Sequence, residues 1–475
     1  MDSMSKLLYS MNVFVLLSVF SLAAFFCLLM HRETLTIGSL LLVILPVARG
    51  GPLLDINTGL FKLALTAAFF LAVIHQRIAR RFFSADYHRI GLLMVLLSLI
   101  AATAFLMSED KTLSSSYTAC FFTSILAFFI FCRLFDRKFL RKALVMLSLS
   151  TFGACGLAIL QYVIIRFRLS APWLLIFVPS EIKMRFLELG GNLSSDVIRL
   201  PSFFFHSNGF GHFLAMVFGL HFVMFIVARK RKEKILYFAS VLAILISCLL
   251  TLSRGSVLII AGEGLVLLIL FRRELIRTKM RIFTVGTCFL LIGIFALGPN
   301  LQNFLERIQA AGLANRDINW GYAIRLLPRH FLFGTGPGMC SYQMLSSYPF
   351  SEEYFGQMSI DLHVSGEINW YISHAHNFYL NAMIETGLFS LLVYGILFWN
   401  VFRKGFQIYS QNNHVLIRAL AAGSFVALLG SLLRGTFESY VFFDSSYVGY
   451  MISFYFAVIL YLDGLPQIRS TARKG

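Results

Sequence analysis

The chain has 475 residues, of which 58% are hydrophobic and 13% are charged, and its mean hydropathy is +0.76. Soluble domains carry about 25% charged residues, so this composition excludes a soluble protein and indicates a polytopic membrane protein. The formal net charge of +18 lies in short basic clusters between apolar stretches, as in the cytoplasmic loops of membrane proteins, and therefore argues against nucleic-acid binding.

Apolar stretches long enough to cross a bilayer recur along the whole chain. We expect them to be helical, because a helix satisfies all of its backbone hydrogen bonds within lipid. They lie near residues 7–30, 59–75, 90–107, 116–132, 143–165, 207–228, 235–251, 255–271, 282–298, 378–402, 415–433 and 446–462. A shorter stretch at 34–48 either spans or only dips into the membrane. The predicted fold class is an all-α polytopic integral membrane protein with about twelve transmembrane helices.

Basic clusters occupy every second connection between these stretches, so that side is predicted to be cytoplasmic. The alternate loops then face outward. Residues 1–298 are expected to hold transmembrane helices with a smaller outward loop at 166–206. Residues 299–377 form one large outward loop, and residues 378–475 hold the C-terminal transmembrane helices and a cytoplasmic tail.

The large loop is the only long polar interruption of the chain, and its length of roughly 75 residues is typical of a functional segment rather than a link. Residues 315–325 read as the start of an amphipathic helix, on which Arg316 and Trp320 share a face. A glycine-rich run at 333–338 lacks the lysine of a P-loop, so we interpret it as a tight turn back to the membrane.

Candidate functional residues gather on the outward side. Arg254 lies at an outward turn between two helices, where it either serves the site or snorkels to the lipid headgroups. Arg199 precedes a helix whose N-terminus favours an anion, although Ser207 or Asn208 also suits a simple helix cap. Within the membrane, Glu263 is expected to pair with an arginine or with a histidine such as His212 or His221.

The large loop ends on His374 and His376, just before a predicted helix. Histidine titrates near neutral pH, so either ring suits a general base that takes a proton from a hydroxyl. Two histidines at i and i+2 do not share a helix face, and no third residue stands at a metal-like spacing. We therefore predict neither a metal nor another cofactor. Outward arginines complement this base, because guanidinium groups bind and stabilise a diphosphate leaving group.

Several short motifs, in this order and spacing across roughly residues 199–400, resemble the superfamily of bacterial O-antigen ligases and O-antigen polymerases. They are Leu252-Ser253-Arg254-Gly255, Arg316 with Trp320, Phe331-Leu332-Phe333-Gly334-Thr335-Gly336-Pro337-Gly338, His374-Ala375-His376-Asn377-Phe378-Tyr379-Leu380 and Glu385-Thr386-Gly387-Leu388. The resemblance implies a metal-independent glycosyltransferase of the inner membrane that works on the periplasmic face. Its donor would be an undecaprenyl-diphosphate-linked glycan, and its acceptor either lipid A-core or a second lipid-linked glycan.

The family's functional residues carry over to Arg254, Arg316 and either His374 or His376, and Arg199 matches an arginine that precedes the middle helices in many members. The expected roles are His374 or His376 as base, Arg316 as a catalytic cation and Arg254 as a diphosphate ligand, with Arg199 and Arg325 assisting. Ligase and polymerase remain open, because Pro201-Ser202 replaces a common glycine. The alternative of another class is a transporter or flippase of lipid-linked glycans.

Overall fold

The computed structural model describes residues 66–67, 70, 85–166, 202, 207–276, 316–347, 375–438 and 446–465. Over these ranges the chain forms helices joined by turns and contains no strand. The all-helical class predicted from the sequence is confirmed for this part of the chain. The stretches expected at 7–30, 34–48 and 282–298, and most of 59–75, lie outside the described residues.

Among the described residues, seven helices are long and apolar enough to cross a membrane. They are α4 (Ala85–Met107), α5 (Lys111–Leu134), α6 (Arg137–Arg166), α8 (Ser207–Val227), α9 (Arg231–Thr251), α17 (Phe378–Gln411) and α18 (Val415–Arg434). Shorter apolar helices are α10 (Arg254–Leu270) and α19 (Ser446–Asp463), and the remaining ones are α11 (Arg272–Ile276), α14 (Arg316–His330) and α15 (Cys340–Ser347). Each membrane-length helix coincides with an apolar stretch identified in the sequence.

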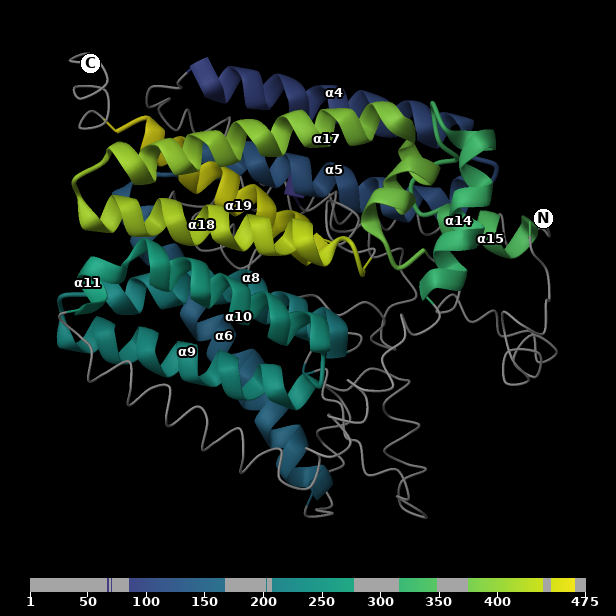
Figure 1. Cartoon of the computed structure of the whole chain (residues 1–475). Coiled ribbons are helices and arrows are strands. Elements are labelled where there is room, and N and C mark those ends of the chain that lie inside the picture. The colour runs from purple at the N-terminus through teal and green to yellow at the C-terminus, as the bar shows by residue number, and fades with distance from the viewer. Residues whose placement is uncertain are drawn as a thin grey trace.

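The long helices run alongside one another in a bundle (Figure 1). Helices α4, α5, α17, α18 and α19 lie together, and α8 joins them to α6, α9 and α10 through its contacts with α18. Helices α8 and α18 approach closely where Gly219 faces Gly423, because neither glycine carries a side chain to separate the two backbones. This close packing brings the start of α8 beside the end of α18.

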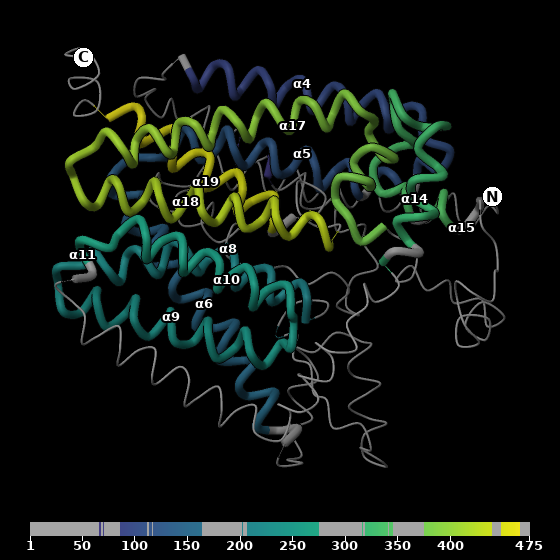
Figure 2. Tube along the Cα trace, in the orientation of Figure 1, coloured from purple at the N-terminus to yellow at the C-terminus, as the bar shows by residue number. Residues whose placement is uncertain are grey.

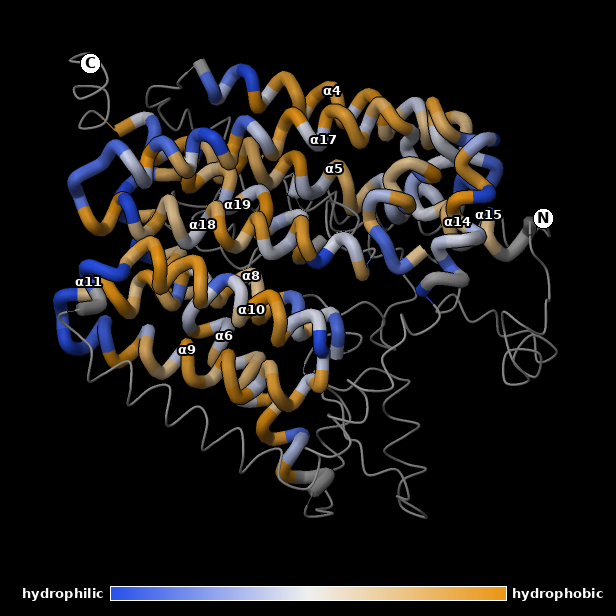
Figure 3. Tube along the Cα trace, viewed as in Figure 1, coloured by the Kyte–Doolittle hydropathy of each residue, from blue (hydrophilic) through white to orange (hydrophobic). Residues whose placement is uncertain are grey.

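The two ends of the bundle differ in character. At the basic end, which holds α11 and the connection between α17 and α18, hydrophilic residues collect at the helix termini (Figure 3). Ion pairs fasten the helices there: the Lys404 ammonium lies 2.6 Å from the Asp86 carboxylate and 3.3 Å from that of Asp463, and Arg418 lies 3.1 Å from Glu274. At the opposite end, called the site end below, α8, α10 and α17 begin and α18 ends.

Part of the predicted large loop is folded over the site end. Helices α14 and α15 lie there beside the ends of α4 and α17 (Figure 2). A small hydrophobic core of their own joins them to the start of α17; its buried members are Ala323, Leu326, Cys340, Met344, Ala375 and Ile384. The helix predicted from residue 315 onward is confirmed as α14, which begins at Arg316.

Helix α17 is broken near its start at Gly387, whose φ of 79° and ψ of 173° are accessible to glycine but strained for other residues. The glycine-rich turn after α14 packs against the break and hydrogen-bonds to backbone groups of α17 that the break leaves without helical partners. Backbone N–H groups of Thr335 and Gly336 donate to the main-chain oxygens of Ile384 and Glu385, at 2.8 and 2.9 Å. Two sequence motifs far apart in the chain, the glycine-rich run and the segment around Gly387, are thus one structural joint.

Replacement of Gly387 by alanine should destabilise this joint, because a Cβ at this position would overlap the main-chain oxygen of Leu332 and the backbone conformation is strained for alanine. Conformations of this kind cost roughly 1–3 kcal/mol before any overlap is relieved. We expect a lower thermal unfolding temperature in detergent. The matched control is Gly395→Ala in the same helix, where nothing lies within 4 Å of the added Cβ. Equal changes in unfolding temperature for the two substitutions would contradict the structural role assigned to Gly387 in this joint.

Candidate active site

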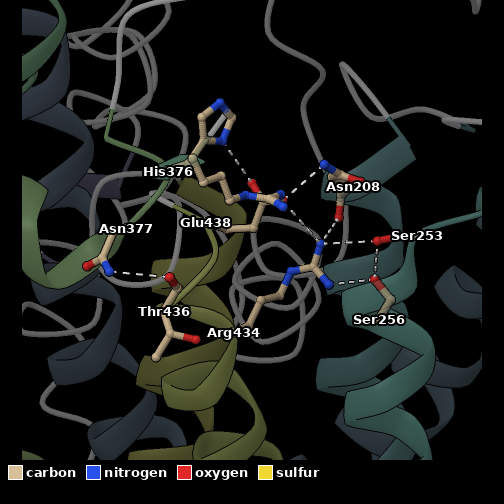
Figure 4. Close-up of polar contacts among 9 residues, drawn as sticks. Asn208, Ser253, Ser256, His376, Asn377, Arg434, Thr436 and Glu438 are labelled. Carbon is tan, nitrogen blue, oxygen red and sulfur yellow. Dashed lines mark hydrogen bonds and ion pairs between the residues drawn. The ribbon is translucent and has the colours of Figure 1, made fainter. Parts of the chain in front are cut away.

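A buried carboxylate, that of Glu438, forms the centre of a polar cluster at the site end (Figure 4). The Asn208 side-chain amide donates to its Oε1 at 3.0 Å, and the Arg316 Nη2 lies 3.3 Å from the same oxygen. The Arg434 Nη2 lies 4.0 Å from Oε1, and the His376 Nδ1 lies 3.8 Å from Oε2. These five residues, called the Glu438 cluster below, come from four separate segments of the chain.

Arg434 is the last residue of α18, and its side chain is only 2% exposed. It joins the ends of three helices, because its Nη1 donates to the Ser256 hydroxyl of α10 at 2.5 Å and its Nη2 donates to the main-chain oxygen of Asn208 in α8 at 2.8 Å. The Ser256 hydroxyl donates in turn to that of Ser253 at 2.9 Å. Gly211 allows this approach, since a side chain there would overlap Ser256.

His376 is fixed by the residue that follows it. The Asn377 side-chain oxygen caps α17 by accepting from the Leu380 N–H at 3.1 Å, while its amide donates to the Thr436 oxygen at 3.2 Å. The next N–H, that of Phe378, donates to the Gly435 oxygen at 2.8 Å. His376 itself has a φ of 46°, a left-handed conformation that is rare outside glycine and is maintained only by such surroundings.

Arg316 reaches the cluster from the first turn of α14. Trp320 follows one helical turn later, and its ring lies 6.5 Å from that of Phe437, between centroids. Both side chains therefore contact the turn that follows α18, which confirms the prediction that Arg316 and Trp320 share one helix face. The tryptophan positions the helix that carries the arginine.

Charge explains why Glu438 stays ionised although it is buried. Burial alone would raise the pKa of its carboxyl, but the facing His376 ring, 3.8 Å away, and the positive charges of Arg434 and Arg316 outweigh burial and hold the pKa well below its usual value. Within the described part of the cluster, the guanidinium groups of Arg434 and Arg316 face this single carboxylate. The cluster consequently carries an excess of positive charge at the mouth of the bundle.

The structure brings together some of the residues singled out in the sequence. Arg316 and His376 meet at Glu438, and Arg254, the first residue of α10, is half-buried next to Ser253, at the edge of the cluster. Arg325 does not join them: it is exposed on α14, with its guanidinium 5.7 Å from the Tyr322 ring centroid. Arg199 and His374 lie outside the described residues.

Arg434 and Glu438 were not predicted from the sequence, and Asn208 was considered there as an alternative helix cap. The sequence does contain a signal for this pair, since an arginine and a glutamate, Arg434 and Glu438, stand four residues apart at the outward end of an apolar stretch. Pairing of Glu263 with His221 is not seen, because the two ring nitrogens of His221 face the Ser148 hydroxyl at 3.1 Å and the Val217 oxygen at 2.7 Å. Among the described residues, no three histidine, cysteine or acidic side chains are grouped to hold a metal ion.

Residues 239–395 match a family model described as O-antigen ligase. The resemblance to the O-antigen ligase superfamily is confirmed over that part of the chain. Arg254, Arg316 and His376 lie inside the matched region, whereas Asn208, Arg434 and Glu438 lie outside it. No curated protein matches the chain.

Substitution Glu438→Gln should destabilise the fold at neutral pH, because it leaves Arg316 and Arg434 facing no anion; breaking a buried pair costs on the order of 3 kcal/mol. The pKa of Glu438 is lowered on folding, so its contribution is complete above the usual value near 4.5 and is lost as the pH falls through the lowered pKa. Thermal unfolding of wild type and Glu438→Gln at a series of pH values measures this contribution to stability. The difference from wild type should shrink in acid.

The exposed Glu109 provides the control, since Glu109→Gln removes the same charge outside the cluster. A pH-independent difference for Glu438→Gln, or an equal loss for both variants, would contradict the assignment of Glu438 as the ionised centre of the cluster.

Proposed function

We propose that this protein is a glycosyltransferase of surface polysaccharide biosynthesis that transfers a glycan from an undecaprenyl-diphosphate carrier to a saccharide acceptor. The family match supports the class of reaction. The observation that carries the proposal is the meeting of Arg316, Arg434 and His376 around Glu438 at one end of the membrane helices. We place this end at the periplasmic face of the bacterial inner membrane, because the basic connections lie at the other end.

The leaving group of such a reaction is a lipid diphosphate, which needs cations that stabilise its developing charge. Arg316 and Arg434 supply guanidinium groups that match phosphate oxygens, and Arg254 stands beside them at the N-terminus of α10. We propose these three as the diphosphate ligands, with Arg199 and Arg325 assisting. Arg325 would have to act from its exposed position along α14, on a more distant part of the donor.

His376 is the favoured base. Its Nδ1 faces the Glu438 carboxylate, so this carboxylate favours the tautomer with the proton on Nδ1 and leaves Nε2 able to accept a proton. The separation of 3.8 Å is longer than a hydrogen bond, and such contacts often tighten when substrate binds. His374, two residues earlier, remains the other candidate for the base.

The proposed reaction is a direct displacement. The acceptor hydroxyl oxygen attacks the anomeric carbon of the donor glycan as the bond between this carbon and the diphosphate oxygen breaks. The hydroxyl proton passes to the His376 Nε2, and the diphosphate retains the bonding electron pair while the arginines hold it. One displacement of this kind inverts the anomeric centre, and no divalent ion is required for charge stabilisation.

Reconstitution tests the proposed function directly. Purified protein in liposomes is supplied with an undecaprenyl-diphosphate oligosaccharide, with and without lipid A-core, in the presence of a chelator, and products are separated by size. Product that requires lipid A-core identifies a ligase, and a ladder formed without it identifies a polymerase. Movement of the donor across the bilayer without transfer to either acceptor would overturn the proposal in favour of a flippase.

Substitution Arg316→Ala should lower turnover by roughly 100- to 1,000-fold, the usual cost of losing one preorganised group that stabilises transition-state charge. The reason is loss of the guanidinium beside Glu438, while the helix remains docked through Trp320. The matched control is Arg329→Ala, an exposed arginine near the other end of α14. Normal turnover by correctly inserted Arg316→Ala protein would exclude the assigned role.

Substitution His376→Ala should lower kcat by roughly 100- to 10,000-fold, the range expected when a general base is removed. Donor affinity should change little, because the arginines that hold the diphosphate are retained. Steady-state kinetics with varied donor separates the two quantities. The paired variant His374→Ala decides between the histidines: a larger loss of kcat there than in His376→Ala would transfer the role of base to His374.

A further inference from the structure

A group of apolar side chains is exposed where α14 ends. Phe331, Leu332 and Phe333 are 41%, 48% and 53% exposed. They follow Arg329 and His330 directly, and Phe333 is the first residue of the glycine-rich run at 333–338. Consecutive large apolar residues exposed in this way mark a surface that another apolar phase or molecule covers.

The neighbours of this segment belong to the membrane-facing surface of the bundle. The Phe333 ring lies 6.3 Å, between centroids, from that of Phe389 on α17, which is itself 48% exposed. Phe331, Leu332 and Phe333 also line one cleft of about 420 Å³ together with Met107, the 59%-exposed last residue of α4; the polar side of the same cleft is formed by Glu109, Arg329, His330, Thr335 and Gln343. Because α4 and α17 are both long and apolar enough to span, the segment is continuous with surfaces that lipid covers.

The backbone on either side of the segment, and the Phe331 oxygen within it, is hydrogen-bonded inside the protein. Non-helical chain at membrane depth must have its polar groups paired within the protein, because lipid offers no hydrogen bonds. Four hydrogen bonds of 2.8–3.0 Å pair backbone groups here: Gly334 N–H to His330 oxygen, Leu388 N–H to Phe331 oxygen, Thr335 N–H to Ile384 oxygen and Gly336 N–H to Glu385 oxygen. The same bonds satisfy the helix break at Gly387.

We propose that Phe331–Phe333 is an interfacial wedge that inserts into the lipid leaflet at the site end. Apolar side chains enter the acyl region, and the preceding Arg329 and His330 lie at headgroup level, where basic and aromatic residues are favoured. The wedge holds the C-terminal end of α14 at a fixed depth. Arg316 stands at the other end of this helix, about 20 Å away at 1.5 Å per residue, so the wedge sets the position of the Glu438 cluster relative to the membrane.

Depth-dependent fluorescence quenching tests the wedge in the full-length protein in liposomes. The native tryptophans Trp173, Trp320, Trp370 and Trp399 are replaced by phenylalanine, and Phe333→Trp is introduced. Phospholipids brominated close to the headgroup end of the acyl chain should quench the emission strongly, because the ring lies near the interface. Lipids brominated near the methyl end should quench it less.

Two further variants in the same background calibrate the experiment. A protein that retains only Trp399, 67% exposed on α17, reports a lipid-facing position on a spanning helix. Asn413→Trp, in the exposed connection between α17 and α18, reports a position in water. The proposal is overturned if bromolipids quench Phe333→Trp no more than Asn413→Trp.

A photoreactive benzoyl-phenylalanine at position 333 gives a second readout that keeps all native tryptophans, in case the tryptophan-free protein does not fold. Irradiation in liposomes should yield phospholipid adducts, detected by intact mass. Adducts to a second copy of the chain, or to the same chain alone, would show that protein rather than lipid covers the segment and would overturn the wedge. Neither readout requires catalysis, so the wedge can fail while the proposed function stands.

Discussion

The ionised carboxylate of Glu438 is the interaction on which the arrangement of the site end depends. Its negative charge offsets guanidinium groups that would otherwise repel one another at the mouth of the bundle, and it joins α8, α14, α18 and the start of α17. A buried charge is tolerated only when paired and hydrogen-bonded, and both conditions are met here. The positions of Arg316, Arg434 and His376 thus rest on a residue that is not itself a cation or a base.

The membrane helices make this convergence possible. Helices α8 and α18 approach closely at Gly219 and Gly423. This packing along the helices brings Asn208 beside Arg434 at the site end. The joint between the glycine-rich turn and Gly387 holds the end of α14 beside the start of α17. Helix packing in the membrane and a backbone joint above it therefore place side chains that are distant in sequence within one cluster.

Hydropathy was enough to predict the described spanning helices, because an apolar stretch in lipid has few alternatives to a helix. Local patterns also identified Arg316 with Trp320 and led to the proposal of a base at His374 or His376. Glu438 and Arg434 were not predicted from the sequence, because their contacts arise from packing between helices, which no short-range spacing encodes. The glycine-rich run was interpreted as a turn without its partner, since pairing with Gly387 requires the tertiary fold. The pairing of His221 with Ser148 could not be predicted either, because these residues are distant in sequence and meet only in the tertiary fold.

The order of the segments along the chain has a consequence for biogenesis. Arg316 and His376 are synthesised well before Glu438, which leaves the ribosome only after α18. A nascent chain that has already inserted α8 and α17 holds the Arg316 guanidinium without its counter-charge until the α17–α18 hairpin is complete. The cluster is therefore assembled late, and arrival of one acidic residue converts a set of mutually repelling side chains into a closed polar site.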